Sequence, residues 1–217
     1  MLKKDYTHIF WDFNGTILDD TEACFQSEND LFLKYGYPLL ASKETYRELF
    51  SFPVKDYYHR MGFDFNVHPY ELLAEEWMDR YLIHAKNAGL CPLVTEALEY
   101  VKAKGIPQWV LSASKITMLE DQLNSLGVRS YFEGVLGQGD IQAGNKDHLG
   151  RAWREAHPDA RVLFLGDTEH DAATAIAMGA DCILLNTGHN SLLRLQNAPA
   201  LFVASNAYEA LTQILAP

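Results

Sequence analysis

The 217-residue sequence predicts an α/β fold, an open and mainly parallel sheet with a helical insertion after its first strand. Three observations predict this fold. Short, continuous apolar runs recur along the chain, which is typical of strands buried on both faces of a parallel sheet. Amphipathic stretches separate these runs and give a βαβ rhythm. The segment from about residue 20 to residue 89 carries only helical signals.

The elements follow from these patterns in chain order. The expected strands are residues 8–11, 108–112, 134–136, 161–165, 181–185 and the short run 201–203, and two of the expected helices are residues 116–126 and 172–178. Within the helical insertion, four apolar side chains recur at spacings of 3, 4 and 4, which places them on one helix face and predicts a helix-packing core. They are Tyr70, Leu73, Trp77 and Tyr81. Residues 1–18 and 90–217 are therefore expected to form the α/β core domain, and residues 19–89 an inserted helical domain.

The composition limits the partners and the compartment. The chain has 18 basic and 29 acidic residues and a net charge of −11, which argues against nucleic acid or an anionic membrane as a partner. No apolar stretch resembles a signal peptide or a membrane-spanning helix. The three cysteines, Cys24, Cys91 and Cys182, are widely spaced and form no CxxC pair. We expect reduced thiols and a cytoplasmic protein.

Polar residues follow several of the expected strands at the edge where an open α/β sheet binds its ligands. Asp12 ends the first strand and Ser112 ends the second. Lys146 lies where a loop enters a helix, and Asp167 and Asp171 follow a later strand. Each alone has an ordinary interpretation, such as a helix cap, a turn residue or a surface lysine. Together they predict one site.

The chemistry of these groups suits phosphoryl transfer. Mg²⁺ prefers oxygen ligands and keeps several waters, so Asp12 and Asp167 at the ends of adjacent strands make a candidate magnesium site. Asp12 can attack phosphorus once a metal offsets the charge repulsion. Ser112 and Lys146 would hold the phosphoryl oxygens as charge redistributes.

With these residues in place, the sequence resembles the haloacid dehalogenase superfamily. The nucleophile motif of that family is DxDGT, and residues 12–16 match it except at Asn14. The hydrophobic-Ser motif matches at Ser112, the phosphate-binding lysine at Lys146, and the GDxxxD motif at residues 166–171, all in family order. Within the superfamily the chain is similar to the phosphoglycolate phosphatase-like branch, which implies a Rossmann-like core and a helical cap inserted between the first two motifs.

The resemblance implies specific roles. Asp12 is the nucleophile, and Mg²⁺ is bound by the Asp12 and Asp167 carboxylates and by the backbone carbonyl of Asn14. Asp171 orients a ligand or binds through water, and Thr16 helps to position the nucleophile. The implied catalytic residues are Asp12, Asn14 and Lys146, and the implied phosphate-binding residues are Ser112, Ala113, Lys146, Gly15 and Thr16. The implied reaction is Mg²⁺-dependent hydrolysis of a small, phosphoglycolate-like phosphomonoester through an aspartyl-phosphate on Asp12.

Asn14 is the departure from the family pattern. In family phosphatases the matching aspartate protonates the leaving oxygen and then activates water, and an asparagine cannot ionise. Dehalogenases also lack that aspartate but need no metal, so the intact acidic motif at residues 166–171 argues against dehalogenation. Phosphonoacetaldehyde hydrolase lacks it too and uses a cap lysine to form an imine, for which Lys55 is the candidate here, although an exposed helix lysine is the ordinary interpretation.

Two further alternatives are a catalytically weak relative that binds a phosphorylated ligand and an asparagine introduced to trap the enzyme. The histidines show no zinc-binding spacing. His170 beside the acidic motif and His189 at another strand end are ambiguous between a structural and a substrate-contacting role. The sequence does not indicate the substrate or the oligomeric state.

Overall fold

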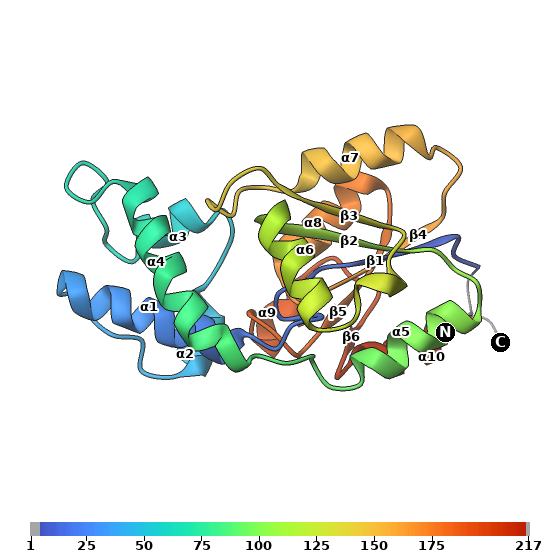
Figure 1. The fold of residues 1–217 in the computed structure, drawn as a ribbon, viewed down its shortest axis with the longest axis horizontal. Coiled ribbons are helices and arrows are strands. Elements are labelled where there is room, and N and C mark those ends of the chain that lie inside the picture. Colours follow the sequence, from blue (N-terminus) through green and yellow to red (C-terminus); the bar gives the residue numbers. More distant parts are fainter. Residues whose placement is uncertain (1–4, 216–217) are drawn as a thin grey trace.

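The computed structural model describes residues 5–215, and within them six parallel strands form one sheet with helices on both faces (Figure 1). The strand order is β3-β2-β1-β4-β5-β6. The strands are β1 His8–Trp11, β2 Gln108–Lys115, β3 Gly134–Gln138, β4 Val162–Gly166, β5 Asp181–Leu185 and β6 Val203–Ala204. The predicted α/β class is confirmed, and β1 lies between β2 and β4 near the centre of the sheet.

Each face of the sheet has its own hydrophobic core because successive strand residues point to opposite sides. Ile9 and Trp11 of β1 belong to the core under α5 (Val94–Ala103), α6 (Ile116–Ser125) and α10 (Ala207–Ile214). Phe10 belongs to the core under α7 (Asp147–Ala156), α8 (Glu169–Met178) and α9 (Leu192–Asn197). Burial on both faces explains why the strands read as continuous apolar runs.

The remaining four helices form a separate group beside the sheet, seen on the left of Figure 1. They are α1 Thr21–Tyr35, α2 Lys43–Leu49, α3 Val54–Arg60 and α4 Tyr70–His84. A third hydrophobic core lies among them, built mainly from aromatic side chains that include Phe32, Tyr46, Tyr57, Phe63 and Tyr70. This group of helices therefore has a core of its own, distinct from the two cores that cover the sheet.

Two chain segments connect the helical group to the sheet, and they run side by side. Leu18 and Leu90 form an antiparallel bridge, and the backbone N–H of Asp19 donates a 2.9 Å hydrogen bond to the carbonyl of Gly89. The N–H of Cys91 donates to the carbonyl of Ile17 at 2.8 Å. These bonds lie at the residues where the sequence predicts that the inserted domain begins and ends.

Some element boundaries differ from the sequence prediction. Strand β2 continues to Lys115, with an irregular register against β3 between Leu111 and Lys115. Helix α8 begins three residues earlier than expected, because the Thr168 side chain accepts a hydrogen bond from the backbone N–H of Asp171 in a capping box. The last strand is found at Val203–Ala204. Among the described residues, none of the helices is long and apolar enough to cross a lipid bilayer.

Candidate active site

Three buried aspartates meet at the carboxyl edge of the sheet. Asp12 follows β1, Asp167 follows β4, and Asp171 lies in the first turn of α8. Since β1 and β4 are neighbouring parallel strands, their carboxyl ends lie together. One carboxylate oxygen from each aspartate lies within 4.8 Å of the others, and all three residues are buried.

The ammonium group of Lys146 lies inside this cluster. Its Nζ atom donates to Oδ1 of Asp12, to Oδ1 of Asp171 at 2.7 Å and to the carbonyl of Leu111 at 3.0 Å. Lys146 precedes α7, and its side chain is 1% exposed. A buried ammonium with three acceptors is fully satisfied, so this lysine is part of the site and is not a surface cation.

The charges in the cluster do not balance. Burial and the nearby Asp171 carboxylate raise the pKa of Asp12 well above its ordinary value, although Lys146 opposes the rise. Burial also raises the pKa of Asp167 to about 6. Burial disfavours the ionised form of Asp171 too, but Lys146 outweighs it and holds the pKa of that carboxyl below its usual range. Three carboxylates share one ammonium, so a divalent cation would relieve the excess negative charge.

The oxygen donors fit a hard cation such as Mg²⁺. Among the described residues, Lys146 is the hydrogen-bond partner of Asp12, on Oδ1, so Oδ2 is available as a ligand. Asp167 accepts one hydrogen bond on each oxygen, from the Thr16 hydroxyl at 2.9 Å and from the His189 backbone at 2.6 Å. A carboxylate oxygen accepts more than one partner, so Asp167 can still bind a cation.

Asp171 differs from the other two aspartates. Its Oδ2 atom accepts three hydrogen bonds, from the backbone N–H groups of Asp167 at 3.1 Å and Thr168 at 2.9 Å and from the Thr168 hydroxyl at 2.7 Å. Its Oδ1 atom accepts from Lys146. These bonds fix Asp171 against the loop after β4, where it orients Lys146 and the Asp167 backbone.

Thr16 and Gly15 both lie against Asp167. The Thr16 hydroxyl donates to Asp167, Thr16 is fully buried, and neither residue lines the cavity described below. Gly15 adopts a φ of 73°, and a Cβ added there would lie 2.4 Å from Oδ2 of Asp167. The turn after β1 directs both residues toward Asp167, so the phosphate contacts expected of them stay a prediction.

Ser112 and Ala113 lie where a phosphate could be bound. Both line the cavity next to Asp12 and Lys146. Ser112 lies inside β2 and does not end it, and its Oγ atom accepts a 3.0 Å hydrogen bond from the backbone N–H of Ser114. The stretch of β2 with the irregular register, Ser112 to Lys115, lines the cavity.

The Asn14 side chain is held by three neighbours. Its amide nitrogen donates to Oδ2 of Asp20 at 2.6 Å and to the Tyr81 hydroxyl at 3.3 Å. Its amide oxygen accepts from the Ser114 hydroxyl at 2.8 Å. Sequence reasoning did not identify these three partners, because they come from the helical group and from beyond the predicted end of a strand. The three neighbours require both a donor and an acceptor at position 14, and an amide side chain provides both.

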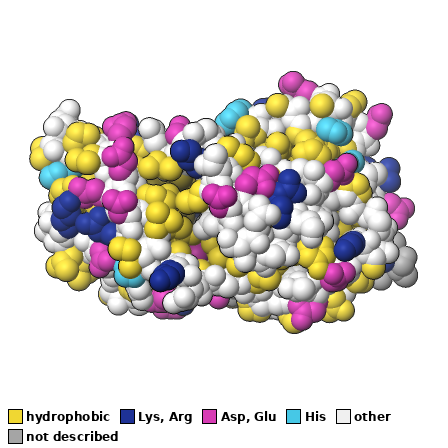
Figure 2. All heavy atoms as spheres, viewed as in Figure 1, with side chains coloured by type: hydrophobic (Ala, Val, Ile, Leu, Met, Phe, Trp, Pro, Cys, Tyr) yellow, Lys and Arg dark blue, Asp and Glu magenta, His cyan; other side chains and the backbone are white. Residues whose placement is uncertain are grey.

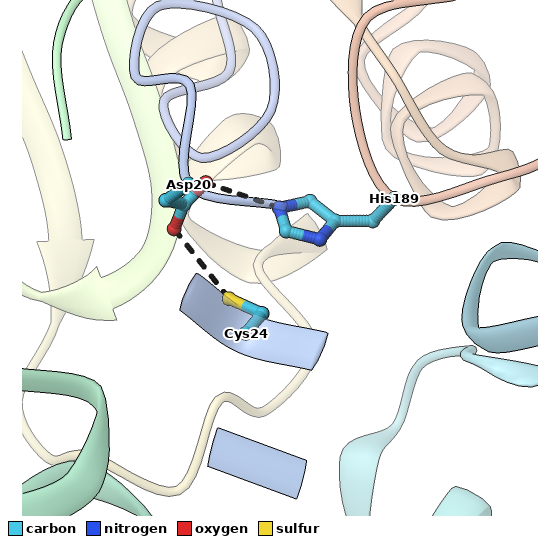
Figure 3. Close-up of side chains that lie close together, drawn as sticks. All are labelled: Asp20, Cys24 and His189. Carbon is cyan, nitrogen blue, oxygen red and sulfur yellow. Dashed lines mark hydrogen bonds and ion pairs between the residues drawn. The ribbon is translucent and has the colours of Figure 1, made fainter. Parts of the chain in front are cut away.

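Asp20 is the centre of that network (Figure 3). Its carboxylate accepts from Tyr81 at 2.8 Å, from Nε2 of His189 at 3.2 Å and from the Cys24 thiol at 3.6 Å. It also accepts from the backbone N–H of Gly15 at 3.1 Å, so it joins the helical group to the turn after β1. Asp20 precedes α1 but makes no side-chain cap of that helix.

The charge state of this network is set by Asp20 and His189. Burial disfavours ionised Asp20, but hydrogen bonds from His189 and Asn14 outweigh it and lower the pKa of the carboxyl. Burial likewise opposes protonation of His189, but Asp20 outweighs it and raises the imidazole pKa to about 9. Asp20, Cys24 and His189 are close enough to hold a metal ion, yet the hydrogen bonds among them and with Asn14 already satisfy the carboxylate.

The other residues that the sequence left open are found in different places. Lys55 is exposed, its Nζ lies 5.5 Å from the ring centroids of Phe65 and Tyr70, and it does not line the cavity. His170 lines the cavity, and its ring stacks on Phe52 with centroids 4.6 Å apart. Burial lowers the pKa of His170 to about 4, and its Nε2 atom has no partner among the described residues.

Comparisons with known proteins agree with this geometry. The haloacid dehalogenase-like hydrolase family matches residues 9–185. A phosphoglycolate phosphatase from Yersinia pseudotuberculosis is 30% identical over 134 residues, which are 57% of this chain and 56% of that protein. The chain therefore spans little more than half the length of this relative.

Solved structures share the fold. A haloacid dehalogenase-like family hydrolase from Streptococcus pneumoniae superimposes with a TM-score of 0.80 at 19% identity, covering 96% of this chain and 98% of that one. A predicted phosphatase from Clostridium acetobutylicum gives a TM-score of 0.77 at 18% identity, covering 97% and 98%. At these identities the similarity shows the fold alone.

Proposed function

The chain belongs to the haloacid dehalogenase-like hydrolase family, and on that basis we propose that it is a Mg²⁺-dependent phosphatase acting on a phosphomonoester through a phosphorylated Asp12. The observation that carries the proposal is the cluster of Asp12, Asp167 and Asp171 around Lys146 at the carboxyl edge of the sheet. Its donors are oxygen atoms and its charge is negative, as a magnesium site requires. We treat residues 19–89 as the cap over this site.

The first step uses groups that border the cavity. One oxygen of the Asp12 carboxylate would attack phosphorus while the other would bind the metal, and the bond from phosphorus to the ester oxygen would break as the leaving group takes a proton from water. The Ser112 hydroxyl, the Ala113 backbone N–H and the Lys146 ammonium would hold the phosphoryl oxygens. Mg²⁺ bound by Asp12 and Asp167, with the Asn14 backbone carbonyl as the third protein ligand, would supply charge neutralisation and orient the phosphoryl group.

The second step needs a base for the attacking water, and Asn14 does not provide one. Its amide neither ionises nor has a free donor, because both of its donor contacts are directed at Asp20 and Tyr81. The slow step of the proposed reaction is therefore hydrolysis of the aspartyl-phosphate. His170 has an unpartnered Nε2 on the same cavity and is the imidazole best placed to accept a proton there.

The test is release of phosphate from p-nitrophenyl phosphate with Mg²⁺ and with excess chelator. We expect hydrolysis only with the metal, and loss of hydrolysis in Asp12→Asn. Asp19→Asn is the matched control, because Asp19 is an exposed aspartate in the same segment. Mass spectrometry of acid-quenched protein should find the phosphoryl group on the peptide that contains Asp12. Hydrolysis that persists in Asp12→Asn would refute the proposal.

A further inference from the structure

One cavity joins the sheet edge to the helical group. It contains about 970 Å³ of empty space, counting the solvent at its mouth, and it opens between the two parts of the molecule. In Figure 2, hydrophobic side chains gather in the depression between the helical part and the sheet part. The cap side of the lining is mostly aromatic and includes Tyr46, Phe50, Phe52, Tyr58, Tyr70 and Trp77. Such a lining is typical of a site for a small molecule with an apolar body.

Glu28 is the exception in this lining. It lies on α1, is 2% exposed, and its Oε2 atom has no hydrogen-bond partner among the described residues. Eight residues separate it from Asp20 along the chain, which corresponds to roughly 12 Å along the helix axis. Asp20 contacts Asn14, so Glu28 lies about two helical turns farther along α1 than the residue that touches the turn after β1.

Among the described residues, the groups whose pKa the charge of Glu28 shifts are a thiol and phenols. They are the Cys24 thiol on α1 and the phenols of Tyr46, Tyr57, Tyr58 and Tyr70 on α2, α3 and α4. Burial raises the pKa of Glu28 to about 8, and only the Tyr58 hydroxyl counteracts the rise. A buried carboxyl without a cation is costly, so the fold keeps an acid here that its own residues do not neutralise.

Other polar atoms on the cavity are also unsatisfied. Nε1 of Trp77 and Nε2 of His170 have no hydrogen-bond partner among the described residues. Buried polar groups in folded proteins are normally paired, and leaving one unpaired costs stability. With Oε2 of Glu28 and the Tyr58 hydroxyl, four such atoms border this one cavity, where a bound ligand can supply their partners.

The lysines of the cavity lining and the buried Glu28 lie on opposite sides of the cavity. Lys146 and Lys115, the two lysines of the lining, both belong to the sheet edge, where a phosphate would bind. Glu28 belongs to the opposite, helical side. A ligand that matches this arrangement carries a phosphate at one end and a cation or a hydrogen-bond donor at the other, with an apolar body between them.

We infer that the substrate is a phosphomonoester of an elongated, largely aromatic or aliphatic alcohol whose far end carries an amino group that Glu28 binds. This inference rests on the phosphatase activity proposed above and adds the class of leaving group. It separates this chain from phosphatases of small carboxylated esters such as phosphoglycolate, because a carboxylate on the leaving group would face the Glu28 side chain in an apolar site. A glycolyl group would also leave most of the aromatic lining without contact.

The experiment compares three aryl phosphates that share a phenolate leaving group and differ only at the far end of the ring. They are 4-(2-aminoethyl)phenyl phosphate, 4-propylphenyl phosphate and 4-(2-carboxyethyl)phenyl phosphate. Because the three esters have equal intrinsic reactivity, differences in kcat/KM between them measure how well the cavity binds the far end of each ester. At about pH 8, where about half of the Glu28 carboxyl is ionised, we expect the amino ester to exceed the propyl ester by at least about tenfold, with the carboxyl ester slowest.

Glu28→Gln preserves the side-chain volume and removes the charge, so it should reduce the preference for the amino ester to about threefold or less. Glu22→Gln is the matched control, since Glu22 is an exposed glutamate on the same helix, and it should keep the wild-type preference. The inference is wrong if the carboxyl ester is the best substrate, if Glu28→Gln keeps the wild-type ranking, or if p-nitrophenyl phosphate is hydrolysed and none of the three esters is.

A failure of the proposed activity gives a different result. If no ester is hydrolysed, p-nitrophenyl phosphate included, the phosphatase proposal fails and titration calorimetry with the same three esters tests the recognition. Binding of the amino ester at least about tenfold more tightly than the propyl ester, lost in Glu28→Gln, would support the role of Glu28 without catalysis. Equal binding of the amino, propyl and carboxyl esters would overturn it.

Discussion

The amide nitrogen of Asn14 donates a 2.6 Å hydrogen bond to Oδ2 of Asp20. A carboxylate therefore does lie beside the turn after β1. It belongs to Asp20 and not to residue 14, and it accepts hydrogen bonds from that turn. An aspartate at position 14 would bring a second carboxylate into contact with the first. The neighbours of Asn14 therefore favour an amide over a carboxylate at this position. A substitution of Asn14 can change the rate of catalysis and the free energy of unfolding independently.

The first prediction concerns stability. Asn14→Asp removes the donors to Asp20 and Tyr81 and adds a like charge, so we expect a loss of roughly 1–3 kcal/mol in the free energy of unfolding at neutral pH. The loss should shrink in acid, where one carboxyl of the pair binds a proton. The double variant Asn14→Asp/Asp20→Asn restores a donor and an acceptor and should recover most of the loss. Urea unfolding measures all three proteins, and wild-type stability in the single variant would contradict the prediction.

The second prediction concerns the order of the two chemical steps. p-Nitrophenolate leaves without protonation, so Asp12 should be phosphorylated quickly and then hydrolysed slowly. Stopped-flow measurement should show a burst of p-nitrophenolate, and a general base is worth roughly 10²–10⁴ in rate. The Asn14→Asp/Asp20→Asn double variant should abolish the burst and raise turnover toward that range.

A linear time course in the wild-type protein would instead mean that another group supplies the base. His170→Gln then distinguishes the candidates, because it removes the unpartnered imidazole nitrogen on the cavity. A burst that appears only in His170→Gln would identify that histidine as the base.

The third prediction concerns the metal site. A Cβ at Gly188 would lie 2.0 Å from Oδ2 of Asp167, so Gly188→Ala should displace that carboxylate. We expect Mg²⁺ affinity to fall about 10- to 100-fold, as when groups that orient a metal ligand are changed. Gly144→Ala is the control, because nothing lies within 4 Å of a Cβ added there. Calorimetric titration with Mg²⁺ measures both, and equal affinities would contradict the assignment of Asp167 as a ligand.

The fourth prediction uses the raised pKa of Glu28. Burial raises this pKa from 4.5 to about 8, so the folded protein binds this proton more tightly than the unfolded chain does. The stability associated with the protonated carboxyl is complete below about pH 4.5 and is lost as the pH rises through about 8. Glu28→Gln should therefore match the wild type near pH 4.5 and be more stable by about 1–4 kcal/mol above pH 8, because a tenfold difference in proton affinity corresponds to about 1.4 kcal/mol. Thermal unfolding across this range measures the difference, and Glu22→Gln should show none.

Much of the fold was predictable because strands buried on both faces leave a strong apolar signal. The ends of β1 and β4 then identified Asp12 and Asp167, since parallel strands place their carboxyl ends at one edge. Lys146 was identified by motif order, and its burial between two carboxylates came only from the structure.

The contributions of the helical group could not be predicted in the same way. Glu28 has the sequence context of any acid on a helix, and only the packing of α1 over the cavity buries it. Asp20 directly precedes α1, yet its carboxylate does not cap that helix and accepts hydrogen bonds from Asn14 and His189. Trp77 and Tyr81 pack in the helical core as expected, and they also line the cavity. The periodicity of these residues predicted which face of α4 is buried. It did not predict that this face borders the cavity as well as the helical core.

The position of β1 between β2 and β4 has a consequence for how the chain folds. Ile9 pairs with Gln108 on one side and with Leu163 on the other, so both neighbours of the first strand are far away in the sequence. Contacts of such long range form slowly because loop closure precedes them. During synthesis His8–Trp11 leaves the ribosome long before either partner, while the helical group between β1 and β2 can already close its local contacts. The apolar first strand therefore stays unpaired until the second half of the chain has been synthesised. An unpaired apolar strand is prone to aggregation, so this segment has the greatest need of protection in the nascent protein.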